Sequence, residues 1–304
     1  MTPRIAITGA NGFIGRHVTL AATAERREVV GVVRSEEAAR AVVGAGGRGV
    51  IVNDLADERL AAAFEGATAV IHLAQIGAQR GNATYAAINV EGTRRVIVAA
   101  KQAGVARIVF FSGLGVAHYG MAPRCTNPYF LSKLAAELSL FESGLAITIF
   151  RPSYIVGPRD AWIPLVLKQM AEGELERVGD GLYRMQPIAV RDAAQLVLAA
   201  ASGAAERHRV FDLVGPEPIT VQGFYDRLGV AARRAGRVGD WRVREIPVAE
   251  ADRAALAGGY RGMGKDELDC LLCDEVSDAR PLESLLGRFL TPLDEALGHA
   301  LRGA

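Results

Sequence analysis

Residues 8–15 read Thr-Gly-Ala-Asn-Gly-Phe-Ile-Gly, and this stretch decides the fold class. Its three glycines recur every third residue, directly after the strand-like run Arg4–Thr8 and at the start of a helical pattern. Glycine permits a tight turn and lets the backbone approach a pyrophosphate, whose charge the N–H groups at a helix start stabilise. The pattern predicts the opening unit of a Rossmann fold; a purely structural glycine turn is the alternative. The cofactor contacts that we predict here are Gly9, Asn11, Gly12, Phe13, Ile14, Gly15 and Arg16.

Outward from this loop, short runs rich in Val and Ile alternate with longer segments rich in Ala, Glu and Arg. This alternation predicts a parallel sheet that is covered by helices on both faces. We therefore expect an α/β fold with a doubly wound Rossmann sheet. The expected strands span residues 4–8, 29–33, 49–52, 69–73, 107–111, 146–150 and 209–214. The expected helices span residues 14–23, 88–103, 128–143 and 191–201.

After residue 151 the alternation weakens, because several prolines and glycines break the chain into shorter pieces. We expect residues 1–151, with about 187–214, to form the cofactor-binding domain. Residues from about 152–186, with 215–304, are expected to form a smaller, mostly helical substrate-binding domain. An amphipathic segment at 292–301 predicts a final helix in that domain.

Composition limits the classes of function. Half of the 304 residues are hydrophobic and the net charge is +1, which favours a packed globular protein over one that binds nucleic acid. A strand-like run close to the N-terminus predicts a cytoplasmic protein. No apolar stretch approaches the roughly 20 residues that span a bilayer, so we expect no membrane span. Cys270 and Cys273 have metal-ligand spacing but lack a second pair nearby, so we predict a buried helix and no metal site.

The end of the second strand bears on the choice of cofactor. The chain there reads Val32-Val33-Arg34-Ser35, where an acidic residue would accept a hydrogen bond from the adenosine ribose. A guanidinium cannot accept that bond but pairs well with a dianionic phosphate, so Arg34 predicts NADP(H) rather than NAD(H). Arg16 is a second candidate cation for the phosphate. The alternative is that both are solvated surface arginines.

Tyr129 and Lys133 stand four residues apart, so a helix projects both side chains from one face. A phenol has an ordinary pKa of about 10, and a nearby ammonium ion and nicotinamide would favour its phenolate form. Tyr129 is therefore our candidate proton donor and acceptor. A core tyrosine beside a solvated lysine is the alternative.

The motifs together resemble those of the extended and atypical short-chain dehydrogenase/reductases. Tyr-Phe-Leu-Ser-Lys at 129–133 stands where a Tyr-x-x-x-Lys pair follows the fifth strand in that superfamily, and Arg-Pro-Ser-Tyr-Ile-Val-Gly-Pro at 151–158 also falls in register. The resemblance covers residues 1 to about 215 and implies that Lys133 binds the nicotinamide ribose. The further cofactor contacts that we expect are Asp54, Leu55, Leu73, Ala74, Gln75, Asn89, Pro152, Ser153 and Tyr154.

One residue of the superfamily's pattern is missing. A Ser or Thr usually holds the reacting oxygen at the position where this chain has Leu114, and leucine offers no hydrogen bond. Ser112 is our third candidate catalytic residue, with Thr126, His118 or a water as alternatives. The chain is also similar to the branch related to the nucleotide-binding accessory subunit of respiratory complex I. Some members of that branch bind NADP(H) without turning over a substrate.

The segments that would face a substrate are rich in aromatic and thioether side chains, which suit a mainly apolar small molecule. The leading hypothesis is an NADPH-dependent oxidoreductase that transfers a hydride to a carbonyl or conjugated centre. The alternatives are a nucleotide-sugar epimerase or dehydratase and a non-catalytic NADP(H)-binding accessory or redox-sensing protein. A homodimer through the helices before and containing Tyr129 is one assembly that the resemblance implies. The predicted substrate contacts, which could equally be core residues, are His118, Tyr119, Met121, Phe130 and Trp162.

Overall fold

A computed structural model describes residues 3–203 and 208–302. Seven strands form one parallel sheet in the order β11-β6-β5-β4-β1-β2-β3. The predicted α/β class and all seven predicted strands are confirmed, with each strand end within two residues of its predicted position. The strands are β1 Arg4–Thr8, β2 Glu28–Val33, β3 Arg48–Ile51, β4 Ala69–His72, β5 Arg107–Phe111, β6 Ala146–Pro152 and β11 His208–Leu213.

The strand order reverses between β1 and β4, because the chain runs outward from β1 to β3 and then returns to the other side of β1. A crevice opens at such a switch point, outside the carboxyl ends of the strands, and ligands bind there in open α/β sheets. The sheet topology thus selects one edge for the functional site.

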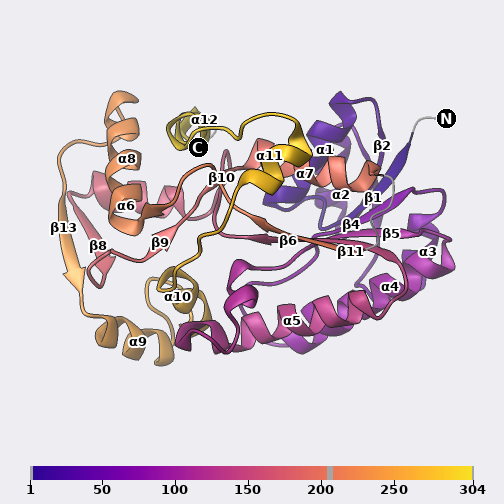
Figure 1. The fold of residues 1–304 in the computed structure, drawn as a ribbon, viewed down its shortest axis with the longest axis horizontal. Coiled ribbons are helices and arrows are strands. Elements are labelled where there is room, and N and C mark those ends of the chain that lie inside the picture. The colour runs from indigo at the N-terminus through magenta and orange to yellow at the C-terminus, as the bar shows by residue number, and fades with distance from the viewer. Residues whose placement is uncertain (1–2, 204–207, 303–304) are drawn as a thin grey trace.

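Helices cover both faces of the sheet, as Figure 1 shows. Strand side chains on each face are buried beneath them, which explains why the strands are almost continuously apolar. One face is covered by α1 Phe13–Ala24, α2 Glu36–Gly44, α7 Val190–Ser202 and α11 Arg280–Leu286. The other is covered by α3 Arg59–Phe64, α4 Gly92–Gln102 and α5 Pro128–Phe141. The helix predicted over 88–103 proves to be two elements, since a π-helical turn, Ala86–Glu91, precedes α4.

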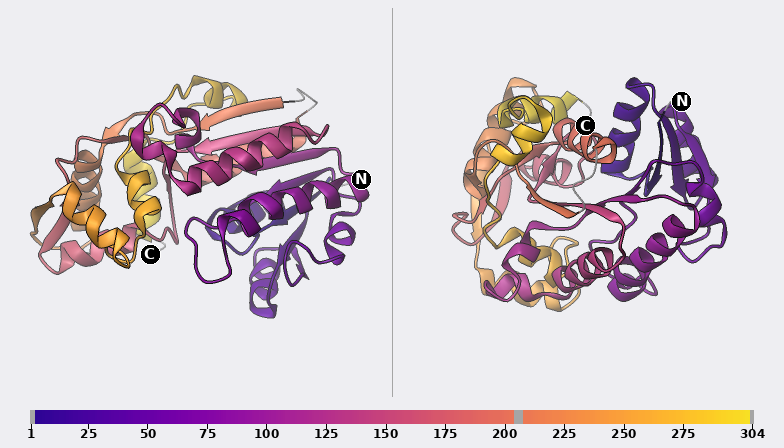
Figure 2. Two further views of the ribbon diagram at one scale, coloured as in Figure 1. Left: turned by 90° about the horizontal axis from the view of Figure 1, so that it is seen from below. Right: turned by 45° about the vertical axis from the view of Figure 1, so that its right-hand side comes forward.

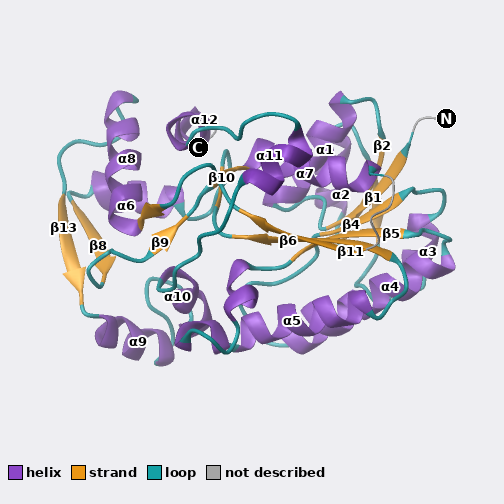
Figure 3. Cartoon of the chain, viewed as in Figure 1, coloured by secondary structure: helices purple, strands orange, loops and turns teal. Residues whose placement is uncertain are grey.

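The other elements gather at one end of the sheet, where Figure 2 shows them in pink, orange and yellow and Figure 3 shows their secondary structure. Their apolar side chains form cores separate from those of the sheet. The predicted final helix is confirmed as α12 Leu293–Arg302. The remaining helices are α6 Ile163–Ala171, α8 Val221–Arg234, α9 Val248–Leu256 and α10 Lys265–Leu271, with short 3₁₀ turns at Leu114–His118 and Pro123–Thr126. The remaining strands are β7 Ile155–Val156, β8 Glu174–Val178, β9 Arg184–Met185, β10 Ile188–Ala189, β12 Ile219–Thr220 and β13 Arg242–Ile246.

Among the helices of residues 3–203 and 208–302, none is long and apolar enough to cross a membrane.

Candidate functional site

The glycine loop joins β1 to α1 at the switch point. Gly9 has φ +70°, and a Cβ there would lie 2.9 Å from the Ala74 backbone nitrogen. A Cβ on Gly15 would lie 2.3 Å from the Gly9 carbonyl oxygen. Glycine is therefore required at both positions, because side chains would separate β4, the loop and α1. No side chain caps the start of α1, where Gly12 is the N-cap, so the first N–H groups of the helix are available to a phosphate.

A cavity of about 280 Å³ lies beside this loop. It collects residues from the ends of β1, β2 and β4, as the switch-point rule predicts. The cavity is also lined by Val32, Val52, Ile76 and Ile88. The sequence did not predict these contacts, because apolar residues in or near buried strands cannot be distinguished from core residues. The predicted residues that line it are Gly9, Asn11, Gly12, Arg34, Asp54, Leu55, Leu73, Ala74 and Gln75.

The Nε2 atom of Gln75 supports a polar occupant for this cavity. It is buried and has no hydrogen-bond partner among the described residues. Leaving a buried donor unpaired costs about 1–3 kcal/mol, so a ligand that accepts from it would be stabilised. The narrow glycine cradle, the uncapped helix start and this donor together fit a dinucleotide with its pyrophosphate at the loop.

Arg34 lies exposed at the rim of the cavity. Ser35 next to it caps α2 by accepting from the Ala38 N–H at 3.2 Å, which fixes the turn after β2. Arg34 has no ion pair within the part of the chain that the structure describes, so its guanidinium is available to an anion. Arg16 lies partly buried in the first turn of α1 and does not line the cavity.

A network of buried hydrogen bonds fixes the backbone beneath the site. His72 Nδ1 lies 2.8 Å from the Thr8 hydroxyl, and His72 Nε2 lies 3.1 Å from the Thr93 hydroxyl. Thr93 donates its proton to the Asn89 carbonyl at 2.6 Å, so it accepts from His72 Nε2–H. Burial lowers the pKa of His72 to about 3, which keeps the ring neutral. This network ties β1, β4 and the π-helical turn together.

Asn89 is fully buried, and its side chain is already occupied. Its Oδ1 accepts from the Ile76 N–H at 2.9 Å, while its Nδ2 donates to the Ile76 carbonyl at 3.0 Å and to Ser132 Oγ at 3.1 Å. It therefore clamps the loop after β4 onto the helix that carries Ser132. This placement favours a positioning role over direct contact with a cofactor.

Tyr129 and Lys133 lie on α5, whose start is set by Pro128 and by Asn127, which accepts from the Phe130 N–H at 3.0 Å. Lys133 is buried, and its Nζ donates to the Phe111 carbonyl at the end of β5 at 2.6 Å. Burial lowers the pKa of Lys133 to about 7.

The pKa of Tyr129 lies above its ordinary value. Burial, with smaller contributions from Cys270 and Glu275, raises the pKa of this phenol. The expected lowering invoked an ammonium ion and a nicotinamide together. Of these two, the Lys133 ammonium is directed at the Phe111 carbonyl, with its Nζ 5.8 Å from the centroid of the Tyr129 ring. The raised pKa favours the protonated phenol.

The loop after β5 shows where the missing hydroxyl would be. Leu114 is fully buried in the core on one face of the sheet, so position 114 does not face a ligand. Ser112 Oγ is buried with no hydrogen-bond partner among the described residues. Phe130, a predicted substrate contact, is instead buried under this loop, where a Cβ on Gly115 would lie 2.3 Å from its ring. Of these side chains, only Ser112 has a polar atom left without a hydrogen-bond partner among the described residues.

A second wall of the site comes from the C-terminal region, and sequence reasoning missed it. Tyr85 packs against Tyr129 with ring centroids 5.8 Å apart, and its hydroxyl donates to the Gly77 carbonyl at 2.8 Å. Cys270 on α10 and Glu275 beyond it lie close enough to Tyr129 to raise its pKa. No motif or spacing in the sequence connects these residues.

Ion pairs hold this wall in place. Arg124 donates to Asp269 at 2.6 Å and to Asp252 through two nitrogens at 3.1 Å each, which joins the loop before α5 to α9 and α10. Asn127 Nδ2 also donates to the Asp266 carbonyl at 3.4 Å. The residue that caps the catalytic helix therefore also binds α10.

The other predicted residues are dispersed. His118 and Tyr119 are partly buried, and Met121 is 74 % exposed. Tyr154 is in the C-terminal core, where it donates to Asp160 at 2.6 Å and packs on Trp162. Its hydroxyl is therefore not free for a cofactor. Pro152 and Ser153 lie partly buried at and just after the end of β6, and Phe13 and Ile14 pack against the sheet core.

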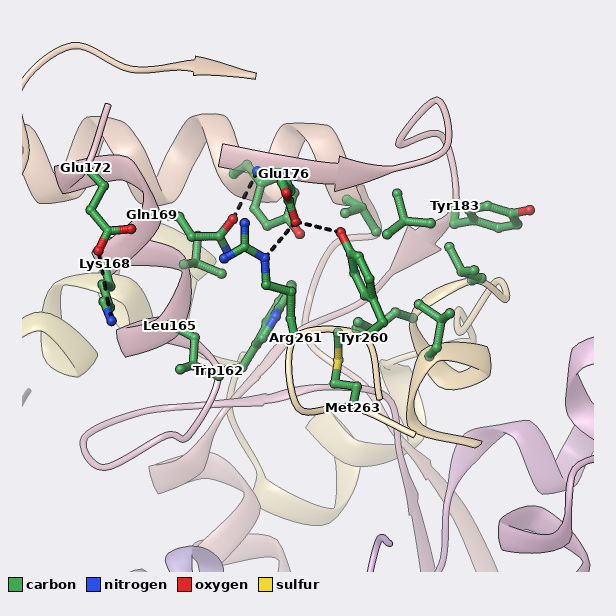
Figure 4. A pocket seen from close by; sticks show the side chains of 17 residues that line it. Trp162, Leu165, Lys168, Gln169, Glu172, Glu176, Tyr183, Tyr260, Arg261 and Met263 are labelled. Carbon is green, nitrogen blue, oxygen red and sulfur yellow. Dashed lines mark hydrogen bonds and ion pairs between the residues drawn. The ribbon is translucent and has the colours of Figure 1, made fainter. Parts of the chain in front are cut away.

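Trp162 lines a second cavity, of about 180 Å³, in the C-terminal region (Figure 4). Its wall is mostly apolar and aromatic, and its main charged groups are paired: Arg261 donates to Glu176 at 2.6 Å, and the Tyr260 hydroxyl donates to the same carboxylate at 3.0 Å. Leu268, Leu271 and Leu272 line this cavity, whereas Cys270 lies near Tyr129. Helix α10 therefore separates this cavity from the catalytic candidates.

The cysteines are free thiols. Cys270 is in α10 as predicted, and Cys273 lies just beyond its end. No group of His, Cys, Asp and Glu in the described part of the chain could hold a metal ion.

The chain belongs to the NAD dependent epimerase/dehydratase family, whose model matches residues 5–213, and so to the extended short-chain dehydrogenase/reductases. It is 30 % identical over 258 residues to the 2-alkyl-3-oxoalkanoate reductase of Stenotrophomonas maltophilia (strain K279a), with 77 % of each chain covered. It is 27 % identical over 287 residues to the 4-hydroxy-2-methyl-3-oxo-4-farnesyl-3,4-dihydroquinoline-1-oxide ketoreductase of Stigmatella aurantiaca, with 84 % of this chain and 85 % of the relative covered.

A solved structure shares the fold over almost the whole chain. The UDP-glucuronic acid 4-epimerase from Bacillus cereus, in complex with UDP-glucuronic acid and NAD, superposes with a TM-score of 0.77 at 19 % identity, covering 99 % of this chain and 98 % of that one. Membership of the family makes a dinucleotide of the NAD(P) type the expected cofactor.

Proposed function

We propose that this protein is an NADPH-dependent reductase that acts on a carbonyl of a mainly apolar small molecule. The observation that carries the proposal is that Tyr129 and buried Lys133 share helix α5, with Lys133 bonded to the end of β5, where the Ser112 hydroxyl that follows has no hydrogen-bond partner among the described residues. Two relatives whose names describe the reduction of oxo groups support the reaction type.

The residues have distinct roles in this proposal. When bound, NADPH would supply the hydride that reduces the carbonyl. Tyr129 gives its phenolic proton to the carbonyl oxygen, so the product is an alcohol. The raised pKa of Tyr129 suits this direction, since the group begins as an acid. Lys133 orients the ribose and Ser112 donates a hydrogen bond to the substrate. Gly9, Gly12 and Gly15 cradle the pyrophosphate, and Arg34 pairs with the 2′-phosphate.

The cavity shown in Figure 4 supports the choice of substrate class. A diphosphate would call for unpaired cations, but Arg261 is paired with Glu176, and the other lining residues are mostly apolar or aromatic. An alkyl or aromatic part of a substrate would be stabilised there by burial of apolar surface. A rotation of α10 or of the loop after it would be needed to join this cavity to Tyr129.

Tyr129→Phe tests the catalytic assignment. We expect turnover of NADPH with 2-alkyl-3-oxo acids and aromatic ketones to fall by about 10²–10⁴-fold, the usual contribution of a general acid. The dissociation constant for NADPH should change little, because the phenol is not needed to bind the dinucleotide. Absorbance at the nicotinamide band and calorimetry measure the two quantities, and unchanged turnover would remove Tyr129 from the mechanism.

The nucleotide-sugar epimerase is the second candidate, favoured by the fold shared with the UDP-glucuronic acid 4-epimerase. Conversion of a UDP-sugar without net consumption of NADPH would establish it. Binding of NADPH with no turnover of either substrate class would favour the non-catalytic module.

We further infer two domains and a homodimer. The separate cores support a cofactor domain of residues 1–151 with about 187–214 and a substrate domain of about 152–186 with 215–304, except that α11 packs Leu282 into the core of the sheet. Exposed Val98 on α4, with Leu131 and Leu138 on α5, supports association through these helices.

A further inference from the structure

The cavity shown in Figure 4 has a preformed aromatic wall, to which Trp162 and Tyr225 contribute. Trp162 stacks on Phe224 with ring centroids 5.3 Å apart and planes 12° apart. Tyr225 packs on Trp162 at 5.8 Å, and Tyr154 meets the indole edge-on at 5.1 Å. Because these rings already hold one another in place, binding a ligand against them costs little further ordering of side chains.

The volume of the cavity limits its occupant to about one ring. It measures about 180 Å³, and an apolar protein cavity of roughly 150 Å³ is large enough to bind benzene. A nucleotide would not fit. Tyr183 and Tyr260 add two more rings to the lining. Aromatic pairs gain more than the burial of their area alone, so this wall favours a planar ring over an alkyl group of the same size.

The charged groups around the cavity favour a neutral occupant. The Glu176 carboxylate accepts from Arg261 at 2.6 Å and from the Tyr260 hydroxyl at 3.0 Å, and Figure 4 shows both side chains directed at it. Lys168, the other cation of the lining, is largely exposed and lies 3.9 Å from Glu172. Neither cation is free to neutralise a buried anion, so a carboxylate or phosphate on the ligand would stay unpaired.

One hydrogen-bonding group of the wall is free. Tyr225 is 7 % exposed and lines the cavity, but its hydroxyl has no hydrogen-bond partner among the described residues. Most buried polar side chains have such a partner, and a phenol can both donate and accept. An oxygen atom on a bound ring would satisfy this hydroxyl and so would be selected over a plain hydrocarbon.

We propose that this cavity binds a neutral, single aromatic ring that carries a hydroxyl or ether oxygen, with the ring against Trp162 and the oxygen bonded to Tyr225. The inference deepens the reductase function proposed above and rests on it, since it names the apolar part of the substrate as an oxygen-substituted aryl group. The carbonyl that is reduced belongs to another part of the same molecule.

The two tryptophans of the chain provide a direct readout of binding. Trp162 lines the cavity, whereas Trp241 lies outside it and packs under Arg233. The probe is phenol, which is neutral at pH 7 and cannot be reduced by NADPH. In protein with isotope-labelled tryptophan, phenol should shift the indole N–H resonance of Trp162 saturably and leave that of Trp241 in place. Trp241→Phe assigns the two signals, because it removes one of them.

Two further probes test the chemistry of the ligand. Cyclohexanol keeps the hydroxyl but has no aromatic ring, and we expect it to bind about 10-fold more weakly than phenol, as the loss of aromatic contacts predicts. Benzoate keeps the ring but is an anion, and it should leave Trp162 unshifted. Cyclohexanol binding as tightly as phenol would overturn the aromatic assignment, and benzoate binding as tightly would overturn the neutral one.

Met263→Trp tests the location by filling the cavity. Met263 lines it from the loop before α10, so the larger side chain should abolish the shift of Trp162 by phenol. Leu256→Trp is the matched control, because it also adds an indole but at a side chain that is 71 % exposed and outside the cavity. It should bind phenol as the wild type does. A Trp162 signal that phenol does not move, or moves equally in Met263→Trp, would overturn the proposal.

Tyr225→Phe tests the hydrogen bond. It removes only the free hydroxyl, so affinity for phenol should fall by about 2- to 10-fold, the usual contribution of one neutral hydrogen bond. The melting temperature of the free protein should not fall, since the hydroxyl has no protein partner to lose. Unchanged affinity, or a lower melting temperature, would contradict the role given to Tyr225.

Turnover separates this inference from the function on which it rests. Met263→Trp should raise KM for hydroxyaryl ketones more than for alkyl ketones while the dissociation constant for NADPH stays constant. Equal changes of the two KM values would overturn the assignment of the ring to the substrate. Absence of wild-type turnover on every carbonyl, with the Trp162 shift retained, would instead overturn the reductase function and leave the cavity as a site for an aromatic ligand.

Discussion

The glycine loop and the segment 265–275 belong to two parts of the proposed site, and different forces specify them. The loop is defined within eight consecutive residues, because Gly9 and Gly15 are required by backbone contacts of 3 Å or less. The segment is held by partners distant in sequence, such as Arg124 for Asp269 and Arg184 for Glu275. The comparison teaches that the cofactor side of the site is locally encoded, whereas the substrate side is assembled by tertiary contacts.

Gly15→Ala should have the largest effect, because it disrupts the glycine loop, the locally encoded cofactor side of the site. Its methyl group would lie 2.3 Å from the Gly9 carbonyl oxygen, so α1 must move away from the loop. We expect the NADPH dissociation constant, measured by calorimetry, to rise by at least about 100-fold, equivalent to about 3 kcal/mol.

Gly44→Ala is the matched control, since a Cβ there meets nothing within 4 Å. It should leave NADPH affinity unchanged. Equal effects of the two substitutions would mean that the tight approach at the loop does not govern binding.

Arg34→Asp should have the next largest effect. It should change only the affinity for the cofactor and so tests that side of the site by itself. Loss of charge-assisted bonds to the 2′-phosphate, worth about 1.5–3 kcal/mol, predicts about 10- to 100-fold weaker NADPH binding. NADH binding should change little, because it lacks that phosphate. Arg40→Asp, an exposed charge reversal on α2 outside the cavity, is the control, and equal losses for both cofactors would contradict the assignment.

Arg124→Gln should have the smallest effect. It acts on the substrate side of the site, which tertiary contacts assemble. It leaves Asp269, which is 5 % exposed, with Lys265 but without Arg124 as an ion-pair partner, and should lower the free energy of unfolding by about 1–3 kcal/mol. Loosening of α10 should raise KM for the carbonyl substrate several-fold while NADPH affinity stays constant.

Arg95→Gln provides the comparison for that variant, because it breaks only an exposed pair with Glu91 on α4. Thermal unfolding and steady-state kinetics measure both proteins. If Arg124→Gln weakened NADPH binding as much as it raised KM, the two sides of the site would not be independent.

Much of the fold could be predicted because its signals are periodic and local. Buried parallel strands require apolar runs, and each predicted strand appeared at its place. The π-helical turn before α4 could not be foreseen, since the same sequence suits an α-helix. The raised pKa of Tyr129 could not be predicted from the sequence, because it depends on burial and on Cys270 and Glu275, which lie more than a hundred positions away.

The sequence by itself determined the class of fold, the glycine loop, the Tyr129–Lys133 pair and membership of the family, because short-range sterics and helical periodicity dictate them. Only the tertiary structure decided that Leu114 is a core residue, that Asn89 is a clamp and that Arg184 holds the backbone of Glu275. These features arise from contacts across a folded chain, and burial then sets which side chains carry protons and which hydrogen bonds remain unpaired.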